Sequence, residues 1–175
     1  IKSFGEAVAY ALDLCDSREL SRIPINNEIE TPGSNKKIIA APELSSEEYK
    51  ILEEQCTSRE IDCIDRGMRD RLTGVDVVFT YEDIAIAETG TVVINCPREE
   101  LRLATMLCEY HVCIVARSKV MKDAFAAESQ LQKFMLNMPN YTAFITGPSR
   151  TADIERVLAI GVHGPLELHV LLLED

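Results

Sequence analysis

Long apolar runs are absent from this sequence, although 46% of its 175 residues are hydrophobic. A membrane-spanning helix needs about 18 or more consecutive apolar residues, and neither that pattern nor a signal peptide is present. The chain begins at Ile1 rather than Met, which leaves an N-terminal targeting segment open. Length and composition predict a single domain over residues 1–175 with one core, and we expect it in the cytoplasm.

Positive charge is scarce. The chain has 18 Lys and Arg against 29 Asp and Glu, a net charge of -11. Nucleic acids and anionic membrane surfaces require a clustered positive field, so neither is expected as a partner. A small carboxylate or phosphate ligand is compatible with this composition, because one or two local cations are enough to hold it.

Cysteine pairs with metal-binding spacing are also lacking. The six cysteines stand at positions 15, 56, 63, 96, 108 and 113 and form no C-x-x-C pair. Their spacings match no common zinc or iron–sulfur pattern, and the three histidines are isolated and give a weak metal signal. We therefore predict no metal or cofactor in this chain, and buried cysteines in a reducing compartment.

Several enzyme signatures are missing as well. The sequence contains no glycine-rich phosphate loop, no nucleophile elbow and no dinucleotide fingerprint. These motifs position nucleotide phosphates or a catalytic serine. Their absence argues against a self-contained nicotinamide dehydrogenase.

The patterns that are present predict an α/β domain. Apolar residues at spacings of three and four predict helices at 4–16, 61–72, 99–107 and 118–135. Ser45 and Glu48 have the spacing of a capping box, which predicts a helix that runs to about residue 55 or 58. Apolar and β-branched runs predict strands at 37–41, 75–80, 84–87, 91–94, 111–116, 141–146 and 166–173.

These elements suggest how the sheet is built. The strand–helix–strand unit 111–146 is long enough for a right-handed parallel crossover, and a hairpin at Glu88-Thr89-Gly90 adds antiparallel pairing. We expect a three-layer domain with a mixed sheet and flanking helices. Residues 1–36, a helix and a loop rich in Pro, Gly and Asn, are expected to be peripheral.

The polar loop Gly147–Glu155 follows a strand that we predict to be buried. Ligands in open α/β sheets bind at such carboxyl ends of strands. Ser149 or Thr151 can cap a short helix whose free N–H groups face an anion, and Arg150 adds a cation suited to a carboxylate or phosphate. The alternative is a capped helix whose Arg150 pairs with Asp153 or Glu155 on the surface.

Three stretches make the chain recognisable: Asp83–Thr91, Gly147–Glu155 and Gly161–Pro165. They resemble the motifs of the LUD-domain family, that of lactate utilization protein C, in a match of about 100 residues from Val75 to Leu173. The resemblance implies a fold like that of glucosamine-6-phosphate deaminase, ribose-5-phosphate isomerase and the CoA transferases. It also implies a role in oxidising L-lactate to pyruvate as one subunit of a three-protein complex, with iron–sulfur clusters in the partner subunits.

The same motifs supply the candidate site residues. Glu88 and His163 are candidate catalytic acid–base groups, against the alternatives of an exposed hairpin carboxylate and a histidine bonded to its own loop. The candidate ligand-binding residues share turns and strand ends: Thr89, Gly90, Thr91, Gly147, Ser149, Arg150, Thr151, Asp153 and Gly164.

Three functions remain open at this point. The first is a non-catalytic or co-catalytic subunit of a lactate-oxidising complex that binds iron–sulfur lactate-utilization subunits. The second is a stand-alone isomerase- or transferase-type enzyme that acts on a sugar phosphate or a CoA ester. The third is a small-anion-binding regulatory module.

Overall fold

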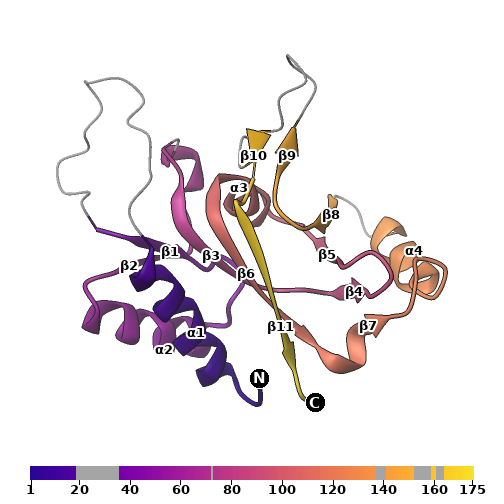
Figure 1. Ribbon diagram of the computed structural model, residues 1–175, viewed down its shortest axis with the longest axis horizontal. Helices are drawn as coiled ribbons and strands as arrows, with labels where there is room; N and C mark the ends of the chain where they lie inside the picture. Colours follow the sequence, from indigo (N-terminus) through magenta and orange to yellow (C-terminus); the bar gives the residue numbers. More distant parts are fainter. Residues whose placement is uncertain (19–35, 72, 137–140, 152–158, 161–163) are drawn as a thin grey trace.

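The computed structural model describes residues 1–18, 36–71, 73–136, 141–151, 159–160 and 164–175 (Figure 1). Within them lie a five-stranded sheet in the order β11-β6-β3-β1-β2, a four-stranded sheet in the order β7-β4-β5-β8, and the ribbon β10-β9. The strands of the five-stranded sheet are β1 Ile38–Ala40, β2 Asp62–Ile64, β3 Val75–Tyr81, β6 Cys108–Ala116 and β11 Glu167–Leu173. The remaining strands are β4 Ile84–Ile86, β5 Thr91–Asn95, β7 Val120–Met121, β8 Thr142–Thr146, β9 Arg150–Thr151 and β10 Ala159–Ile160. The helices are α1 Phe4–Ser17, α2 Ser46–Ser58, α3 Glu99–Leu107 and α4 Glu128–Leu136, with short 3-10 turns at Met68–Asp70 and Arg117–Lys119.

The five-stranded sheet is parallel throughout and forms the centre of the molecule. Its inner strands β3 and β6 are almost entirely buried, as expected for parallel strands covered on both faces. Helices α1 and α2 pack against one face, where Leu12 and Leu52 meet Phe79. Helix α3 and the four-stranded sheet cover the other face. The α/β fold class with flanking helices is therefore confirmed, and the antiparallel hairpin belongs to a second sheet.

Helix α1 is part of the core, so the expectation that the N-terminal helix is peripheral is wrong. Its side chains Ala7, Val8, Ala11 and Leu12 are fully buried. The N-terminus also meets the last strand, since the amide of Glu174 donates to the carbonyl oxygen of Ile1 at 3.0 Å. The two termini accordingly lie side by side (Figure 1). The loop that follows α1 lies outside the described residues, and a single domain over residues 1–175 stays a prediction.

Helix α2 begins as its sequence predicts. The Ser45 side chain accepts from the amide of Glu48 at 3.3 Å, and the Glu48 carboxylate accepts from the amide of Ser45 at 3.2 Å. These reciprocal bonds satisfy two amides that a helix start would otherwise leave without partners. The predicted helix at 99–107 and the hairpin 84–94 are also confirmed.

One predicted helix is wrong, and a second begins later than predicted. Within the predicted helix 61–72, the described residues contain β2 and a short 3-10 turn, because β2 adds to the parallel sheet beside β1. Residues 118–135 begin with a 3-10 turn and strand β7, and α4 starts at Glu128. Ser118 does not cap that helix; its amide donates to the Asp175 carboxylate. In both segments pairing with a neighbouring strand outweighs local helical periodicity.

The predicted parallel crossover over 111–146 is also wrong. Strand β8 pairs antiparallel with β5, in the second sheet, rather than parallel with β6. It is not a buried strand, since Phe144 is 55% exposed. The second sheet packs Ala85 and Val92 toward Cys113 and Val115 of the main sheet, while α4 covers its other face.

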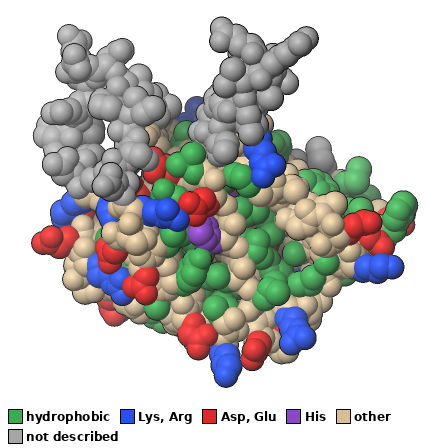
Figure 2. Space-filling view, viewed as in Figure 1, with side chains coloured by type: hydrophobic (Ala, Val, Ile, Leu, Met, Phe, Trp, Pro, Cys, Tyr) green, Lys and Arg blue, Asp and Glu red, His purple; other side chains and the backbone are tan. Residues whose placement is uncertain are grey.

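The surface agrees with the charge composition. On the face shown in Figure 2, basic side chains lie interspersed with acidic ones, and no basic patch gathers among the described residues. Many of these basic side chains form salt bridges with acidic ones. Arg59, for example, pairs with Asp13 and Asp16 at 2.7 and 2.9 Å. Within the described part of the chain, no helix has both the length and the apolar character needed to cross a membrane.

Candidate functional site

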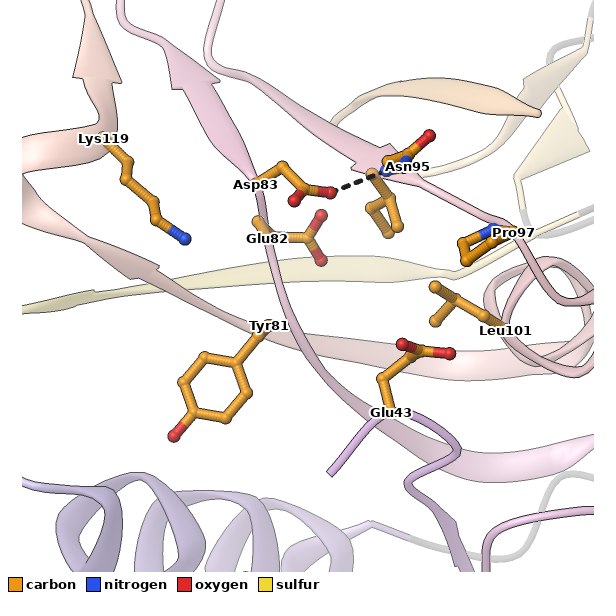
Figure 3. A pocket seen from close by; sticks show the side chains of 9 residues that line it. Glu43, Tyr81, Glu82, Asp83, Asn95, Pro97, Leu101 and Lys119 are labelled. Atoms are coloured by element: carbon orange, nitrogen blue, oxygen red, sulfur yellow. Dashed lines mark hydrogen bonds between the residues drawn. The ribbon is translucent and has the colours of Figure 1, made fainter. Parts of the chain in front are cut away.

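A cavity of about 280 Å³ lies at the carboxyl edge of the parallel sheet (Figure 3). This edge is where open α/β folds bind ligands, because loops from several strands diverge there. The lining side chains come from the ends of β3 and β5, the start of α3 and the segments after β1 and β6: Glu43, Tyr81, Glu82, Asp83, Ile94, Asn95, Pro97, Leu101 and Lys119.

Glu82 and Asp83 reach the cavity because the chain leaves one sheet for the other at this point. The amide of Glu82 still bonds to the Ile114 carbonyl oxygen in β6 at 2.8 Å, whereas the amide of Asp83 bonds to the Val93 carbonyl oxygen in β5 at 3.2 Å. The Asp83 carboxylate accepts a hydrogen bond from the backbone amide of Asn95 at 2.8 Å. Backbone pairing therefore fixes two acidic residues at the junction of the sheets.

Behind Glu82 lies a fully buried polar cluster. The Thr80 hydroxyl donates to Oε1 of Glu82 at 2.7 Å and lies 2.8 Å from Nε2 of His111. Nε2 is 3.5 Å from the Glu82 carboxyl, and donor atoms of Glu82, His111 and Cys113 lie within 4.8 Å of one another. The expectation that the histidines have no acidic or cysteine companions is wrong for His111. These donor types can hold a metal ion.

Burial sets the protonation of this cluster. It raises the pKa of Glu82, and the hydrogen bonds from His111 and Thr80 oppose that shift only in part. Burial likewise raises the pKa of the Cys113 thiol well above its usual value. Removing a charge from water disfavours its ionised form, so burial favours the protonated form of both groups.

Three buried polar atoms at the site have no hydrogen-bond partner among the described residues. They are Oε2 of Glu82, Nδ1 of His111 and Oδ1 of Asn95. Buried polar groups in proteins are almost always paired, since an unpaired one costs about 1–3 kcal/mol. Such atoms beside a cavity are candidates for contact with a bound ligand.

The charges around the cavity are partly compensated. Glu43 pairs with Arg98 at 2.8 Å, and the Tyr81 hydroxyl points away to Glu48, at 2.8 Å. In Figure 3 the carboxyl groups of Glu82 and Asp83 lie between Lys119 on one side and Asn95 on the other. Lys119 thus contributes a positive charge on the other side of these two carboxyl groups from Asn95.

The predicted hairpin residues lie elsewhere. Asp83 and Asn95 stand at the open end of the β4–β5 hairpin, whereas Glu88, Thr89 and Gly90 form its turn at the other end and are exposed. Glu88 does not line the cavity. Thr91 is buried, and its hydroxyl lies 2.6 Å from that of Thr89 and 2.7 Å from that of Thr146. Thr91 therefore joins the hairpin to the strand that leads into Gly147.

The structure brings some residues of the predicted loop site close together. The Ser149 amide donates to the Pro165 carbonyl oxygen at 2.8 Å, and a Cβ added to Gly164 would lie 3.3 Å from that of Ser149. Arg150 and Thr151 form strand β9, paired with β10, so they do not open the predicted helix. Asp153 and His163 lie outside the described residues.

The cavity residues were missed because their signal is faint in the sequence. The run Tyr81-Glu82-Asp83, directly after a buried strand, is the one available sign, and it resembles a polar turn. Asn95 and Lys119 carry no motif. Asn95 and Lys119 lie near Glu82 only because of how the strands pair, and the pairing of strands cannot be read from the sequence.

A model of the LUD-domain family matches residues 1–173. The chain belongs to the LUD-domain family. The family predicted from the motif resemblance is confirmed, and the cavity with its buried cluster lies in a LUD domain.

Curated relatives of this LUD domain are named lactate utilization protein C. One from Macrococcus caseolyticus is 33% identical over 103 residues, covering 57% of this chain and 45% of its own length. Those from Geobacillus sp. and Bacillus subtilis are 36% and 33% identical, each covering 57% of this chain and 43% of the relative. The chain therefore spans less than half the length of these relatives. A solved DUF162 family structure from Deinococcus radiodurans covers 100% of both chains with a TM-score of 0.42 and 15% identity.

Proposed function

We propose that this LUD domain acts in L-lactate utilization, as a substrate-binding part of a complex that oxidises L-lactate to pyruvate. Family membership and relatives named lactate utilization protein C support this assignment. The cavity at the sheet edge is its proposed substrate site. At about 280 Å³ it lies just below the usual range of about 300–1,000 Å³ for ligand pockets, which suits a small metabolite.

One observation carries the proposal: Lys119 and Asn95 line the same small cavity, and the side-chain oxygen of Asn95 has no partner among the described residues. Lactate has a carboxylate and a neighbouring hydroxyl. The ammonium of Lys119 can bind the carboxylate, while Oδ1 of Asn95, buried and without a partner among the described residues, can accept the hydroxyl proton. An α-hydroxy acid matches both groups, whereas a simple alcohol or a simple carboxylate matches one.

The redox step is assigned to partner proteins. Oxidation of L-lactate to pyruvate removes two electrons and two protons, and the electrons need an acceptor. This sequence has no dinucleotide fingerprint and no cluster-binding cysteine spacing. We therefore assign electron transfer to iron–sulfur lactate-utilization subunits, with this chain holding the substrate.

Binding tests the substrate site directly. Calorimetric titration with L-lactate is expected to give saturable binding, weakened about 10- to 100-fold in Lys119→Met, because a charge-assisted contact contributes about 1.5–3 kcal/mol. Asn95→Leu should weaken L-lactate but leave propionate, which lacks the hydroxyl, unchanged. Lys122→Met, which changes an exposed lysine that does not line the cavity, is the matched control. Equal affinities for Lys119→Met and Lys122→Met would refute the site.

Turnover tests the complex. Lactate-dependent dye reduction is expected only when the protein is mixed with its iron–sulfur partners. Conversion of a phosphosugar or a thioester by the protein alone would instead support the isomerase- or transferase-type alternative and overturn the proposal.

A further inference from the structure

Three metal-ligating side chains meet behind the cavity. His111 and Cys113 project from the same face of β6, since strand side chains alternate, and the register places Thr80 of β3 opposite Cys113. Glu82 follows two residues after Thr80. The side chains of all three are completely or almost completely buried, and one donor atom from each lies within 4.8 Å of the others.

We infer that Glu82, His111 and Cys113 bind a divalent transition-metal ion, with Zn²⁺ as the ion they fit. Carboxylate oxygen, imidazole nitrogen and thiolate sulfur together suit a cation of intermediate softness, whereas Mg²⁺ and Ca²⁺ prefer oxygen alone. Three protein ligands also leave a fourth position of a tetrahedral ion for another group. The inference goes beyond the lactate proposal and does not depend on it.

The spacing is close to what a tetrahedral ion requires. Bond lengths of about 2.0–2.3 Å place neighbouring ligand atoms about 3.3–3.7 Å apart. Nε2 of His111 and Oε1 of Glu82 are already 3.5 Å apart. The ligand atoms all lie within 4.8 Å of one another, and a pair at that bound would have to close by about 1 Å, within reach of a side-chain rotation.

Hydrogen bonding alone leaves the cluster unsatisfied. The Thr80 hydroxyl lies 2.7 Å from Oε1 of Glu82 and 2.8 Å from Nε2 of His111, and its single proton can serve only one of these two atoms. Nδ1 of His111 and Oε2 of Glu82 are buried and have no partner among the described residues. A cation bound through Nε2 and the Glu82 carboxylate satisfies the carboxylate, whereas Nδ1 faces away from that ion and needs a separate partner. Binding releases the protons that burial favours on the Glu82 carboxyl and the Cys113 thiol.

The surroundings favour binding an ion over hydrating it. Cys113 packs in an apolar cluster with Ala85, Val92 and Val115, which keeps water from competing for the ligands. Glu82 both belongs to the cluster and lines the cavity, so the cavity gives an ion a route to the cluster. Other buried cysteines of the described chain, such as Cys108, belong to no such group.

Metal titration of the reduced, chelator-treated protein tests the inference. Zn²⁺ is expected to bind with one equivalent, and Co²⁺ to give a thiolate-to-metal charge-transfer band. Cys113→Ala should remove the band and weaken Zn²⁺ binding about 100-fold or more, since loss of even an outer partner of a ligand costs 10- to 100-fold. Cys108→Ala is the matched control, because it removes a buried thiol from the same strand.

Circular dichroism checks that both variants fold. If Cys113→Ala does not, X-ray absorption on the zinc-loaded wild type decides, with one sulfur ligand expected. Equal Zn²⁺ affinity in the two variants, ligation by nitrogen and oxygen alone, or no stoichiometric binding would each overturn the site. Lactate is absent from all of these measurements, so their failure would leave the substrate proposal standing, and the reverse also holds.

Discussion

Gly74 lies where the chain enters β3 beneath the end of α3, and replacing it tests how these elements pack. Its φ is +92°, and an added Cβ would lie 2.8 Å from the Leu107 carbonyl oxygen. We expect Gly74→Ala to lower the free energy of unfolding by about 2–5 kcal/mol. The left-handed backbone costs about 1–2 kcal/mol for a residue with a Cβ, and overpacking against a backbone atom adds about 1–3 kcal/mol.

A matched glycine separates these two contributions. Gly67 has φ +83°, but no atom lies within 4 Å of its added Cβ, so Gly67→Ala should cost only the about 1–2 kcal/mol of the backbone conformation. Urea denaturation at constant pH, with equal m-values, gives both free energies. If Gly74→Ala and Gly67→Ala agree within about 0.5 kcal/mol, the close contact with α3 is absent and the reasoning fails.

Three further perturbations test α2 and the second sheet. Ser45→Ala breaks the capping box and should lower the free energy of unfolding by about 1 kcal/mol in urea denaturation, whereas Ser46→Ala in the same turn should change it by less than about 0.5 kcal/mol; equal effects would contradict the cap. Burial alone would raise the pKa of Glu48, but its hydrogen bonds to Ser45 and a tyrosine lower that pKa. The ionised carboxylate therefore stabilises the folded state. This stabilisation is complete above the unfolded-state pKa of about 4.3 and is lost as the pH falls through the lower folded-state pKa. Thermal melts of Glu48→Gln should show a flatter loss of stability over this acid range than wild type, and identical profiles would refute the linkage. Phe144→Ser should change stability by less than about 0.5 kcal/mol, whereas Val93→Ala, directly opposite and buried, should cost about 1.5–3 kcal/mol; a large loss at Phe144 would show that β8 is covered.

Elements built from local interactions were predictable. The apolar stripe of α1, the Ser45 capping box of α2 and the β4–β5 hairpin each depend on residues a few positions apart. Their signals are therefore complete within a short window of sequence. The family motifs were equally readable, because they are continuous stretches of residues.

Elements decided by strand pairing were not predictable. Residues 61–72 and 118–127 have helical spacing, yet β2 and β7 gain more from joining a sheet. Strand β8 joins β5 instead of β6. Such choices compare the burial and hydrogen bonding of whole sheets, which periodicity within one segment does not measure.

The same division applies to the candidate site. The sequence by itself determined the α/β class, the family and the polar loop around Ser149 and Gly164, because contiguous residues carry them. Only the tertiary structure placed Glu82 against His111 and Cys113 and opened the cavity toward Lys119. The physical reason is the parallel register of β3 and β6, whose backbone hydrogen bonds bring together side chains that are far apart in the sequence.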